Sequence, residues 1–270
     1  MDTAYLKDKA KAIRRLIIEM LAEAGSGHPG GSLSCVEIVT SLYFHIMRHR
    51  PEEPAWAGRD RFVLSKGHCC PTLYSALALS GYFEMGHLKT LRKLGSILHG
   101  HPDMLTTPGI EVSTGSLGQG FSVAAGMALA AKIDKSDSRV YVLLGDGETQ
   151  EGQVWEAAMS AAHYKLENLT AFLDYNKLQI DGRVEDIMGI EPVRLKWESF
   201  GWDVREIDGH NIEEIIKACD EAKSSHKPSM IIAHTIKGKG VSFMEGKAEW
   251  HGVAPTKEEA ERALLEIDNG

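Results

Sequence analysis

Two polar segments, each directly after an apolar run, combine residue types that can hold a metal ion and an anion. Gly145-Asp146-Gly147 follows the apolar run that ends at Leu144, and Asn176 closes a second polar segment after Leu173. Mg²⁺ takes oxygen ligands, and a protein often supplies one or two of them while phosphates supply the rest. Gly147 leaves room for a phosphate at a helix start, where backbone N–H groups and the helix dipole favour anions. The two segments therefore predict a metal-bridged diphosphate.

The Gly-Asp-Gly turn has other interpretations. Taken alone, the tripeptide is equally typical of a strand-to-helix turn with a capping aspartate. A dinucleotide fingerprint requires a third glycine where Gln150 stands, and the chain has no GxxxxGK[ST] segment. The sequence thus excludes a Rossmann cofactor motif and a P-loop.

Several histidines lie beside glycines, which let the backbone turn closely around a ligand. They are His28, His68, His101, His210 and His251. A structural role is the simpler interpretation of any one of them. His210, next to Asn211, indicates a helix entry. His99 and Asp103 flank His101, but three neighbouring residues on one loop rarely complete a metal site.

The elements that must position these residues alternate between strand and helix. Apolar runs predict strands at 61–64, 139–144, 169–173, 202–207 and 230–233. Helical periodicity predicts helices at 6–24, 34–48, 71–80, 151–164, 212–224 and 257–267. This order predicts an α/β fold with a mostly parallel sheet and helices on both faces. Because ligands bind at the carboxyl ends of such strands, both polar segments should face one crevice.

Length and composition limit the class of protein. At 270 residues the chain fits one large domain, and its net charge of −8 without long runs of one sign excludes a nucleic-acid footprint. The longest apolar stretch, 121–131, is about half a membrane span, so no membrane association is expected. Four cysteines form no CxxC pair, which is typical of reduced thiols in the cytoplasm.

The stretch from Asp146 to Asn176 resembles the thiamine diphosphate motif, a GDG followed about thirty residues later by an asparagine. Nearly the whole chain is similar to the N-terminal, diphosphate-binding domain of transketolases. The similarity lies in SGHPGGSLS from Ser26, SKGHCCPTLYSAL from Ser65, GHPD with EVSTGSLGQG between Gly100 and Gly120, the GDG to IDG region, and more weakly in TIKGKGVSFMEGKAEWHG from Thr235. This implies the thiamine-diphosphate-binding PP-domain fold, with residues 1–270 as a single domain.

The resemblance implies a role for each matching polar residue. Asp146 and Asn176 match metal ligands, with the Leu178 carbonyl as a third, for Mg²⁺ or alternatively Ca²⁺ or Mn²⁺. Gly147 matches a diphosphate contact. Residues with expected catalytic roles are His28 and His101, which match contacts to the donor sugar's hydroxyls, and His68 and His251, which match residues near the diphosphate and the reacting centre.

The resemblance implies further cofactor or interface contacts for three other groups of residues. Gly115, Ser116 and Leu117 match the loop that meets the aminopyrimidine, Ile180 and Ile236 match apolar packing around the thiazolium, and Glu151 and Glu156 match carboxylates at a subunit interface. Many transketolases have proline where Ser116 stands, so this loop is expected to be less rigid.

The resemblance also implies a partner. Transketolases continue into a pyrimidine-binding domain and a C-terminal domain, and this sequence ends where the first linker would begin. The expected function is therefore one half of a cytoplasmic two-chain transketolase of carbohydrate metabolism, of the pentose phosphate type. With a partner chain that carries the pyrimidine-binding domain, it would move a two-carbon ketol unit between sugar phosphates. The expected assembly contains two copies of each chain.

Two alternatives remain open at this point. The chain could belong to another thiamine diphosphate enzyme, such as a 2-oxoacid decarboxylating enzyme or a deoxyxylulose-phosphate synthase. His28 and His101 argue against this, because a pyruvate-type donor lacks the hydroxyls that they match. It could also be a non-catalytic cofactor-binding subunit, against which the complete histidine set argues.

Overall fold

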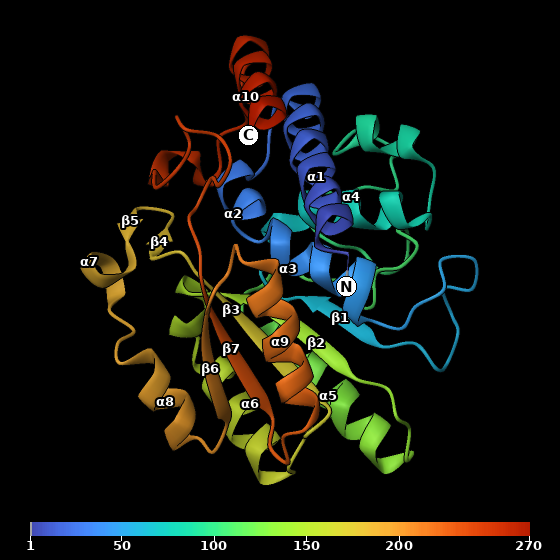
Figure 1. The fold of residues 1–270 in the computed structure, drawn as a ribbon, viewed down its shortest axis with the longest axis vertical. Coiled ribbons are helices and arrows are strands. Elements are labelled where there is room, and N and C mark those ends of the chain that lie inside the picture. The colour runs from blue at the N-terminus through green and yellow to red at the C-terminus, as the bar shows by residue number, and fades with distance from the viewer. Residues whose placement is uncertain (1) are drawn as a thin grey trace.

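A computed structural model describes residues 2–270 and shows one sheet of five strands. All neighbouring strands in it are parallel, in the order β1-β2-β3-β7-β6. The strands are β1 (Arg61–Leu64), β2 (Val140–Gly145), β3 (Leu169–Tyr175), β6 (Asp203–Asp208) and β7 (Ser229–His234). The predicted α/β class and the five predicted strands are confirmed. Figure 1 shows the sheet between its helices.

The strands alternate their side chains between two cores, as the period of two in a strand requires. Tyr141 and Leu143 of β2 pack on one face of the sheet, and Val142 and Leu144 pack on the other. The residues of β2 are apolar up to Gly145 because both faces of the sheet are covered there, whereas the edge strand β6 is mostly polar. Helices contribute the remaining apolar side chains to each core.

One face of the sheet is covered by helices from both ends of the chain. They are α1 (Thr3–Ala24), α2 (Pro29–Ser34), α3 (Val36–Ser41), α4 (Cys70–Ser80), α9 (Ile212–Lys223) and α10 (Lys257–Asn269). The other face is covered by α5 (Gln119–Ile133), α6 (Gly152–His163) and α8 (Val193–Ser199). Shorter elements are the π-helix η1 (Leu42–Ile46), the 3₁₀ helices η2 (Gly67–Cys69), η3 (Met85–Thr90), η4 (Gly147–Gln150) and η5 (Ala248–His251), the strands β4 (Leu178–Gln179) and β5 (Gly182–Arg183), and α7 (Val184–Met188).

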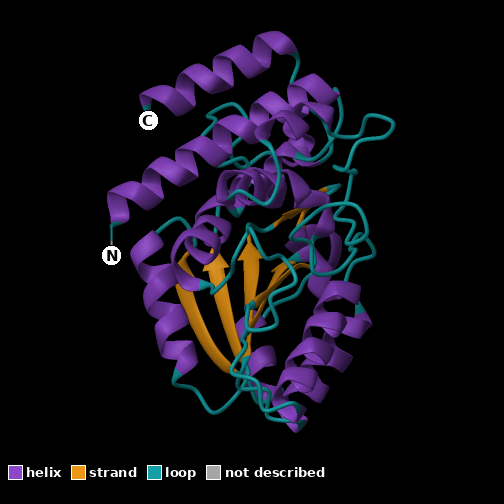
Figure 2. Ribbon diagram, turned by 90° about the vertical axis from the view of Figure 1, so that its right-hand side faces the viewer, coloured by secondary structure: helices purple, strands orange, loops and turns teal. Residues whose placement is uncertain are grey.

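Helix ends follow local chemistry. Gly25 adopts the left-handed conformation that ends α1, as predicted from its position. Thr256 and Glu259 form a capping box at the start of α10. Lys11 of α1 donates to the carbonyl of Asp268, which ties the two terminal helices together beyond the carboxyl ends of the strands. Figure 2 shows the strand arrows pointing toward this pair.

Two local predictions were wrong. The continuous helix expected at 34–48 is instead a series of short helices. The series starts with α2 at Pro29, is interrupted at Cys35, and ends with the π-helix η1. At the break, the Ser34 hydroxyl donates to the buried carboxylate of Asp174, a contact between residues far apart in the sequence. In addition, the whole of α5 was unpredicted, because its apolar residues show almost no preference for one face.

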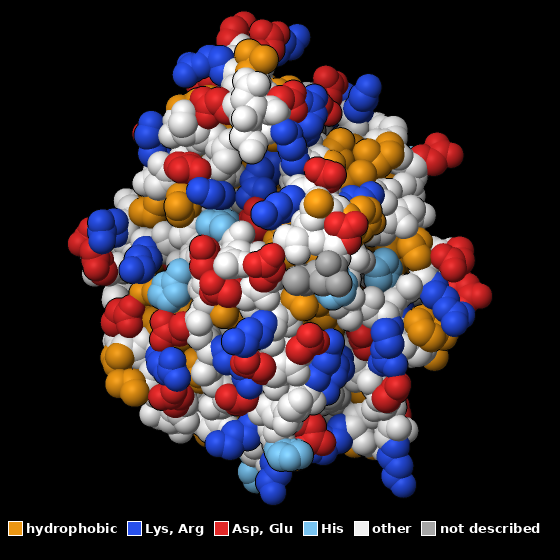
Figure 3. Space-filling view, in the orientation of Figure 1, with side chains coloured by type: hydrophobic (Ala, Val, Ile, Leu, Met, Phe, Trp, Pro, Cys, Tyr) orange, Lys and Arg blue, Asp and Glu red, His pale blue; other side chains and the backbone are white. Residues whose placement is uncertain are grey.

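Surface and interior agree with the composition. Lysine, arginine, aspartate and glutamate side chains are interspersed on the face in Figure 3, without a field of one sign. The four cysteines are free and buried. None of the helices described within residues 2–270 has the length and apolar character needed to cross a membrane.

Candidate active site

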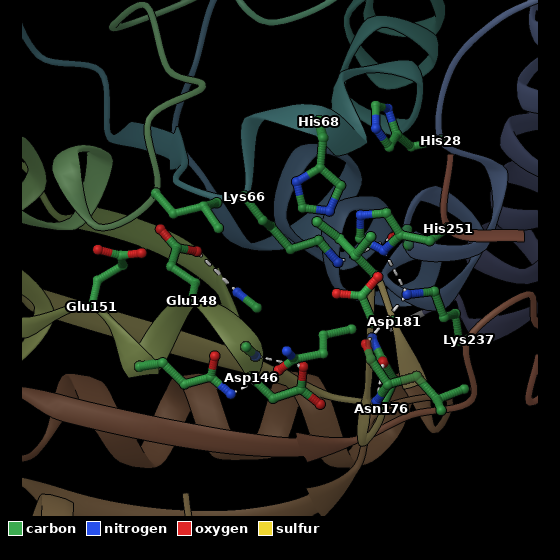
Figure 4. Close-up of a pocket in the computed structure, with 18 of the residues that line it drawn as sticks. His28, Lys66, His68, Asp146, Glu148, Glu151, Asn176, Asp181, Lys237 and His251 are labelled. Carbon is green, nitrogen blue, oxygen red and sulfur yellow. Dashed lines mark hydrogen bonds between the residues drawn. The ribbon is translucent and has the colours of Figure 1, made fainter. Parts of the chain in front are cut away.

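A cavity of about 310 Å³ lies where the loops after β1, β2, β3 and β7 meet. Its position is the one predicted for ligands of a parallel sheet, outside the carboxyl ends of the strands. Figure 4 shows its residues converging from these loops and from the segments near both termini. The residues that line it are His28, Gly31, Lys66, His68, His101, Gly115, Leu117, Gly145, Asp146, Gly147, Glu148, Gln150, Glu151, Asn176, Leu178, Gln179, Ile180, Asp181, Lys237 and His251.

One end of the cavity carries the oxygen-rich group. Asp146 is 3% exposed, and its carboxylate accepts from the backbone N–H groups of Gly147 and Lys177. Lys177 adopts a left-handed conformation with φ of 66°, and this turn brings Asn176 and Leu178 beside Asp146. The arrangement supplies a carboxylate, a side-chain amide and a backbone carbonyl, which are donors suited to a hard cation.

Asp146 has no ion-pair partner among the described residues. Burial, together with the nearby charge of Asp174, raises the pKa of Asp146 to about 7. A buried carboxylate without a counter-charge is costly, so a cation at this position would stabilise its ionised form. Groups of three or more histidine, cysteine or acidic side chains with metal-binding geometry do not occur within residues 2–270. Any metal would therefore depend on the amide and carbonyl donors.

A buried ion pair, Lys66 with Asp174, lies beside the oxygen-rich end of the cavity. Lys66 Nζ contacts Asp174 Oδ2 and donates to the Gly31 carbonyl at 3.1 Å. Asp174 also accepts from Ser34, from Thr235 and from the amide of Asn176 at 3.1 Å. Burial alone would raise the pKa of Asp174, but the charge of Lys66 lowers it below the usual range. The bond to Asp174 leaves the oxygen of the Asn176 amide turned away from the ion pair.

Four histidines gather at the other end, each from a different loop. The ring of His28 lies 5.2 Å from that of His68, 6.4 Å from that of His101 and 5.5 Å from that of His251, measured between centroids. His28 Nδ1 is buried without a hydrogen-bond partner among the described residues. The structure thus brings together at one cavity the four histidines for which the resemblance implied catalytic roles.

The histidines are held neutral. Burial, reinforced by the charge of Arg92, lowers the pKa of His28 to about 4. Burial and the charge of Lys237 lower the pKa of His251 to about 3. The pKa of His68 is also lowered by burial and by Lys66. At neutral pH each of these rings is therefore uncharged, and it can donate one hydrogen bond and accept another.

Lys237 links the two ends. Its side chain is 2% exposed, and Nζ lies 3.2 Å from the Leu178 carbonyl and 2.8 Å from His251 Nδ1. Burial and the charge of Lys66 lower the pKa of Lys237 to about 8. A cavity with two buried lysines and one unpaired carboxylate favours an anion together with a divalent cation.

Glu148 is the third buried acid of the site. One carboxylate oxygen accepts from the Ser65 hydroxyl and from the Gly118 N–H at 2.8 Å, and the other accepts from the Gly145 N–H at 3.0 Å. Burial raises the pKa of Glu148 above its usual range, whereas the three donors favour the ionised form. This side chain joins three loops that line the cavity.

The remaining sequence-predicted residues divide into two groups. Those that line the cavity are Gly115, Leu117, Gly147, Glu151 and Ile180. Ser116, Glu156 and Ile236 are exposed and lie outside the lining. Glu156 is on the solvent-facing side of α6, which fits its expected place at a subunit interface better than a cofactor contact. His210 is also outside the lining; its ring accepts from the Ile236 N–H and contacts Glu37.

Sequence reasoning missed Lys66, Glu148, Asp174 and Lys237. The signal for Lys66 was present, because it follows β1 as Asp146 follows β2, and the strand-end rule applies equally to both. Lys237 lies in the weakly matching TIKGKG segment, where the sequence offered only Ile236. Asp174 begins the polar segment after Leu173, so the strand-end rule applied to it as well. Glu148 had no usable signal, since an acidic residue beside a turn is more often a solvated cap.

Comparisons with known proteins agree over the whole chain. The family model described as "Transketolase, thiamine diphosphate binding domain" matches residues 6–267. A 6-deoxy-6-sulfo-D-fructose transketolase subunit from a Clostridium species is 51% identical over 264 residues, which cover 97% of this chain and 96% of that protein. An apulose-4-phosphate transketolase subunit from Phocaeicola vulgatus is 48% identical over 268 residues, covering 99% and 95%.

A solved structure extends the similarity to the fold. The crystal structure of a transketolase from Campylobacter jejuni superposes with a TM-score of 0.95 at 39% identity. The match covers 99% of this chain but 43% of the solved one, so the chain spans less than half the length of that protein. By contrast, the Clostridium and Phocaeicola subunits have nearly the same length as this chain.

Proposed function

The chain belongs to the transketolase family as a subunit with the thiamine diphosphate binding domain, and on this premise we propose that, with a partner chain, it transfers a two-carbon ketol unit from a ketose to an aldose. The observation that carries the proposal is the single cavity in which four neutral histidines face an unpaired buried carboxylate and two buried lysines. A cavity that only bound the cofactor would not need four uncharged rings along its wall. The same set argues against a purely non-catalytic subunit.

The residues present fit thiamine diphosphate with a divalent metal. Within residues 2–270 Asp146 has no ion-pair partner, and a side chain at Gly147 would place its Cβ 3.3 Å from Gln179. We propose that Asp146, Asn176 and the Leu178 carbonyl hold Mg²⁺, and that the backbone at Gly147 with His68 and Lys237 receives the diphosphate. Lysine and backbone N–H groups are suitable donors for phosphate oxygens. When bound, the cofactor supplies the carbon nucleophile and the electron sink that the cleavage of a carbon–carbon bond beside a carbonyl requires.

The histidines are proposed to handle substrate protons. His28 and His101 would bind the hydroxyls at the two-carbon end of the donor and move protons at those oxygens. Their neutral state provides one donor and one acceptor nitrogen on each ring for such contacts. His68 and His251 lie deeper, and each has a strongly lowered pKa because of burial. They are proposed to contact both the diphosphate and the reacting centre.

The substrates are proposed to be sugars with an anionic group remote from the carbonyl. The similar subunits are named for 6-deoxy-6-sulfo-D-fructose, with a sulfonate, and for apulose 4-phosphate. A role in the pentose phosphate pathway is therefore one of several that this site chemistry supports. Four buried free cysteines are compatible with the cytoplasmic location that we propose.

A partner chain is proposed to complete the cavity. Ile180 is 67% exposed at its rim, and Met188 of α7 is 61% exposed nearby, where its carbonyl accepts from Gln150. Val123 and Ile133 of α5 and Met159 of α6 add further exposed apolar side chains. A partner that covered these side chains would remove their apolar surface from water. We propose that a partner with a pyrimidine-binding domain covers the rim and that two such pairs associate.

The test is reconstitution. The purified chain, thiamine diphosphate and Mg²⁺ should give no ketol transfer from fructose 6-phosphate, apulose 4-phosphate or 6-deoxy-6-sulfofructose. Adding the partner should produce turnover with at least one donor, and native mass measurement should show two copies of each chain. The Asp146→Ala chain with the same partner serves as an inactive control. Turnover by the chain without any second polypeptide would refute the two-chain proposal.

A further inference from the structure

Three cavity-lining segments meet at one side chain. The turn after β1 contains Ser65, the loop before α5 ends at Gly118, and the turn after β2 begins at Gly145. Each donates one hydrogen bond to the carboxylate of Glu148, which is 2% exposed. Glu148 makes all of these contacts from η4, the turn that also carries Gly147.

The Ser65 hydroxyl extends the arrangement into α5. It accepts from the N–H of Phe121 at 3.1 Å while it donates to Glu148. The first turn of α5 has no side-chain cap of its own, so Ser65 satisfies one of its free N–H groups from a different part of the chain. Packing here is close, because a Cβ at Gly120 would lie 2.8 Å from Ser65 Cα. The start of α5 is therefore fixed against the end of β1.

The loop that these contacts hold is 115–117, which follows Thr114, whose hydroxyl donates to the Leu64 carbonyl at 2.8 Å. Gly115 and Ser116 are exposed, and Gly118 adopts a left-handed conformation with φ of 83°. At its helical end the loop has two hydrogen bonds: the N–H of Gln119 donates to the Ser116 carbonyl at 3.3 Å, and the N–H of Gly118 donates to the carboxylate of Glu148. A charged acceptor makes this a strong bond.

From these contacts we infer that Glu148 is a positioning residue, a carboxylate brace that fixes the 115–117 loop relative to the Gly-Asp-Gly turn so that the cavity is formed before the cofactor enters. This inference rests on the proposed function, in which the loop meets the aminopyrimidine and the turn meets the diphosphate. Glu148 acts through the loop and needs no contact with the substrate. Preorganisation of this kind lowers the ordering cost of binding.

The test compares Glu148→Gln with Ser65→Ala and with a matched control. Glutamine keeps the shape but has one acceptor oxygen and one N–H donor group, so at least one of the three donors loses its partner. Ser65→Ala removes only one of the three hydrogen bonds to Glu148, the one from the Ser65 hydroxyl. Asp60→Asn is the control. Asp60 lies directly before β1, whereas Ser65 lies directly after it, and Asp60 is 3% exposed. Like Glu148, it accepts from two backbone N–H groups, those of Arg48 and Arg139.

The first readout is amide hydrogen exchange in the cofactor-free chain. Glu148→Gln should speed exchange in residues 114–119 by about tenfold or more, with a smaller effect for Ser65→Ala and none for Asp60→Asn. The second readout is calorimetric titration of the assembled two-chain enzyme with thiamine diphosphate and Mg²⁺, in which Glu148→Gln should weaken binding by a similar factor. Thermal unfolding identifies any variant that fails to fold. If Glu148→Gln does not fold, Ser65→Ala is compared with Asp60→Asn instead.

The outcomes separate the brace from the proposed function. Unchanged exchange at 114–119 in both variants would overturn the inference whatever the protein binds. Faster exchange with unchanged cofactor affinity would also overturn it, because the loop would then not be positioned for the cofactor. If the unsubstituted assembly fails to bind thiamine diphosphate, the proposed function is refuted by that measurement alone.

Discussion

The ammonium nitrogen of Lys237 lies 2.8 Å from Nδ1 of His251. A charged lysine can only donate, so Nδ1 accepts and the proton of the neutral ring is on Nε2. Replacing Lys237 by Met should raise the pKa of His251 from about 3, because the positive charge that helps to depress it is gone. Burial should still hold it below the usual 6.5. Histidine NMR titration measures this change, and an unmoved pKa would contradict the contact. The same variant should bind thiamine diphosphate more weakly.

Stability should fall in mild acid because of the same cluster. The pKa of His28 is about 4 in the folded chain, as a result of burial and of the charge of Arg92, against 6.5 in the unfolded chain. Below pH 6.5 the unfolded chain binds protons first, so the free energy of unfolding should decrease as the pH falls from 6.5 towards 4. Urea unfolding at several pH values measures this. His28→Gln should show a shallower decrease, and curves parallel to those of the unsubstituted chain would disprove the assignment.

Removal of the metal or of its carboxylate should weaken cofactor binding. Asp146→Ala should reduce the affinity for Mg²⁺ and for thiamine diphosphate together by more than about tenfold, because each anchors the other. The fold should survive, since Asp146 forms no ion pair in the cofactor-free chain. Calorimetric titration of the assembled enzyme, repeated after treatment with a chelator, is the measurement. Unchanged affinity would remove the metal assignment.

Substrate and cofactor roles should separate between two histidines. His101 is exposed at the cavity mouth, whereas His68 lies deeper and stacks on His251 with centroids 5.2 Å apart. His101→Ala should lower kcat by about a hundredfold or more while leaving cofactor affinity nearly intact. His68→Ala should reduce both. Steady-state kinetics and cofactor titration together decide the matter, and equal losses of cofactor binding in the two variants would show that the division is wrong.

The ion pair under the cavity offers a test of the fold. Lys66 is 2% exposed and Asp174 is fully buried, so Lys66→Met leaves a buried charge without a partner. The free energy of unfolding should drop by about 3 to 5 kcal/mol. Adding Asp174→Asn should recover part of the loss, because the uncompensated charge is then removed. Denaturant unfolding of both variants measures this coupling, and a double variant less stable than Lys66→Met would contradict it.

The sequence by itself determined the α/β class, the five strands and the place of the site. This was possible because strand patterns are local, and because the carboxyl ends of parallel strands must lie at one edge of the sheet. Asp146 and Asn176 could therefore be assigned to one crevice from their strand-end positions. The histidines were found differently: each lies beside a glycine, and the resemblance to transketolases separated His28, His68, His101 and His251 from His210.

The tertiary structure alone decided which polar side chains stabilise the site. Glu148 accepts from Ser65, 83 positions away, and Asp174 accepts from Ser34, 140 positions away. No local spacing encodes such pairs, because an acid beside a turn has the same sequence context whether it is solvated or buried. The same holds for α5, whose apolar residues show no helical stripe, and for Glu156, which α6 turns toward solvent. The roles of these residues depend on burial, and packing of distant segments determines burial.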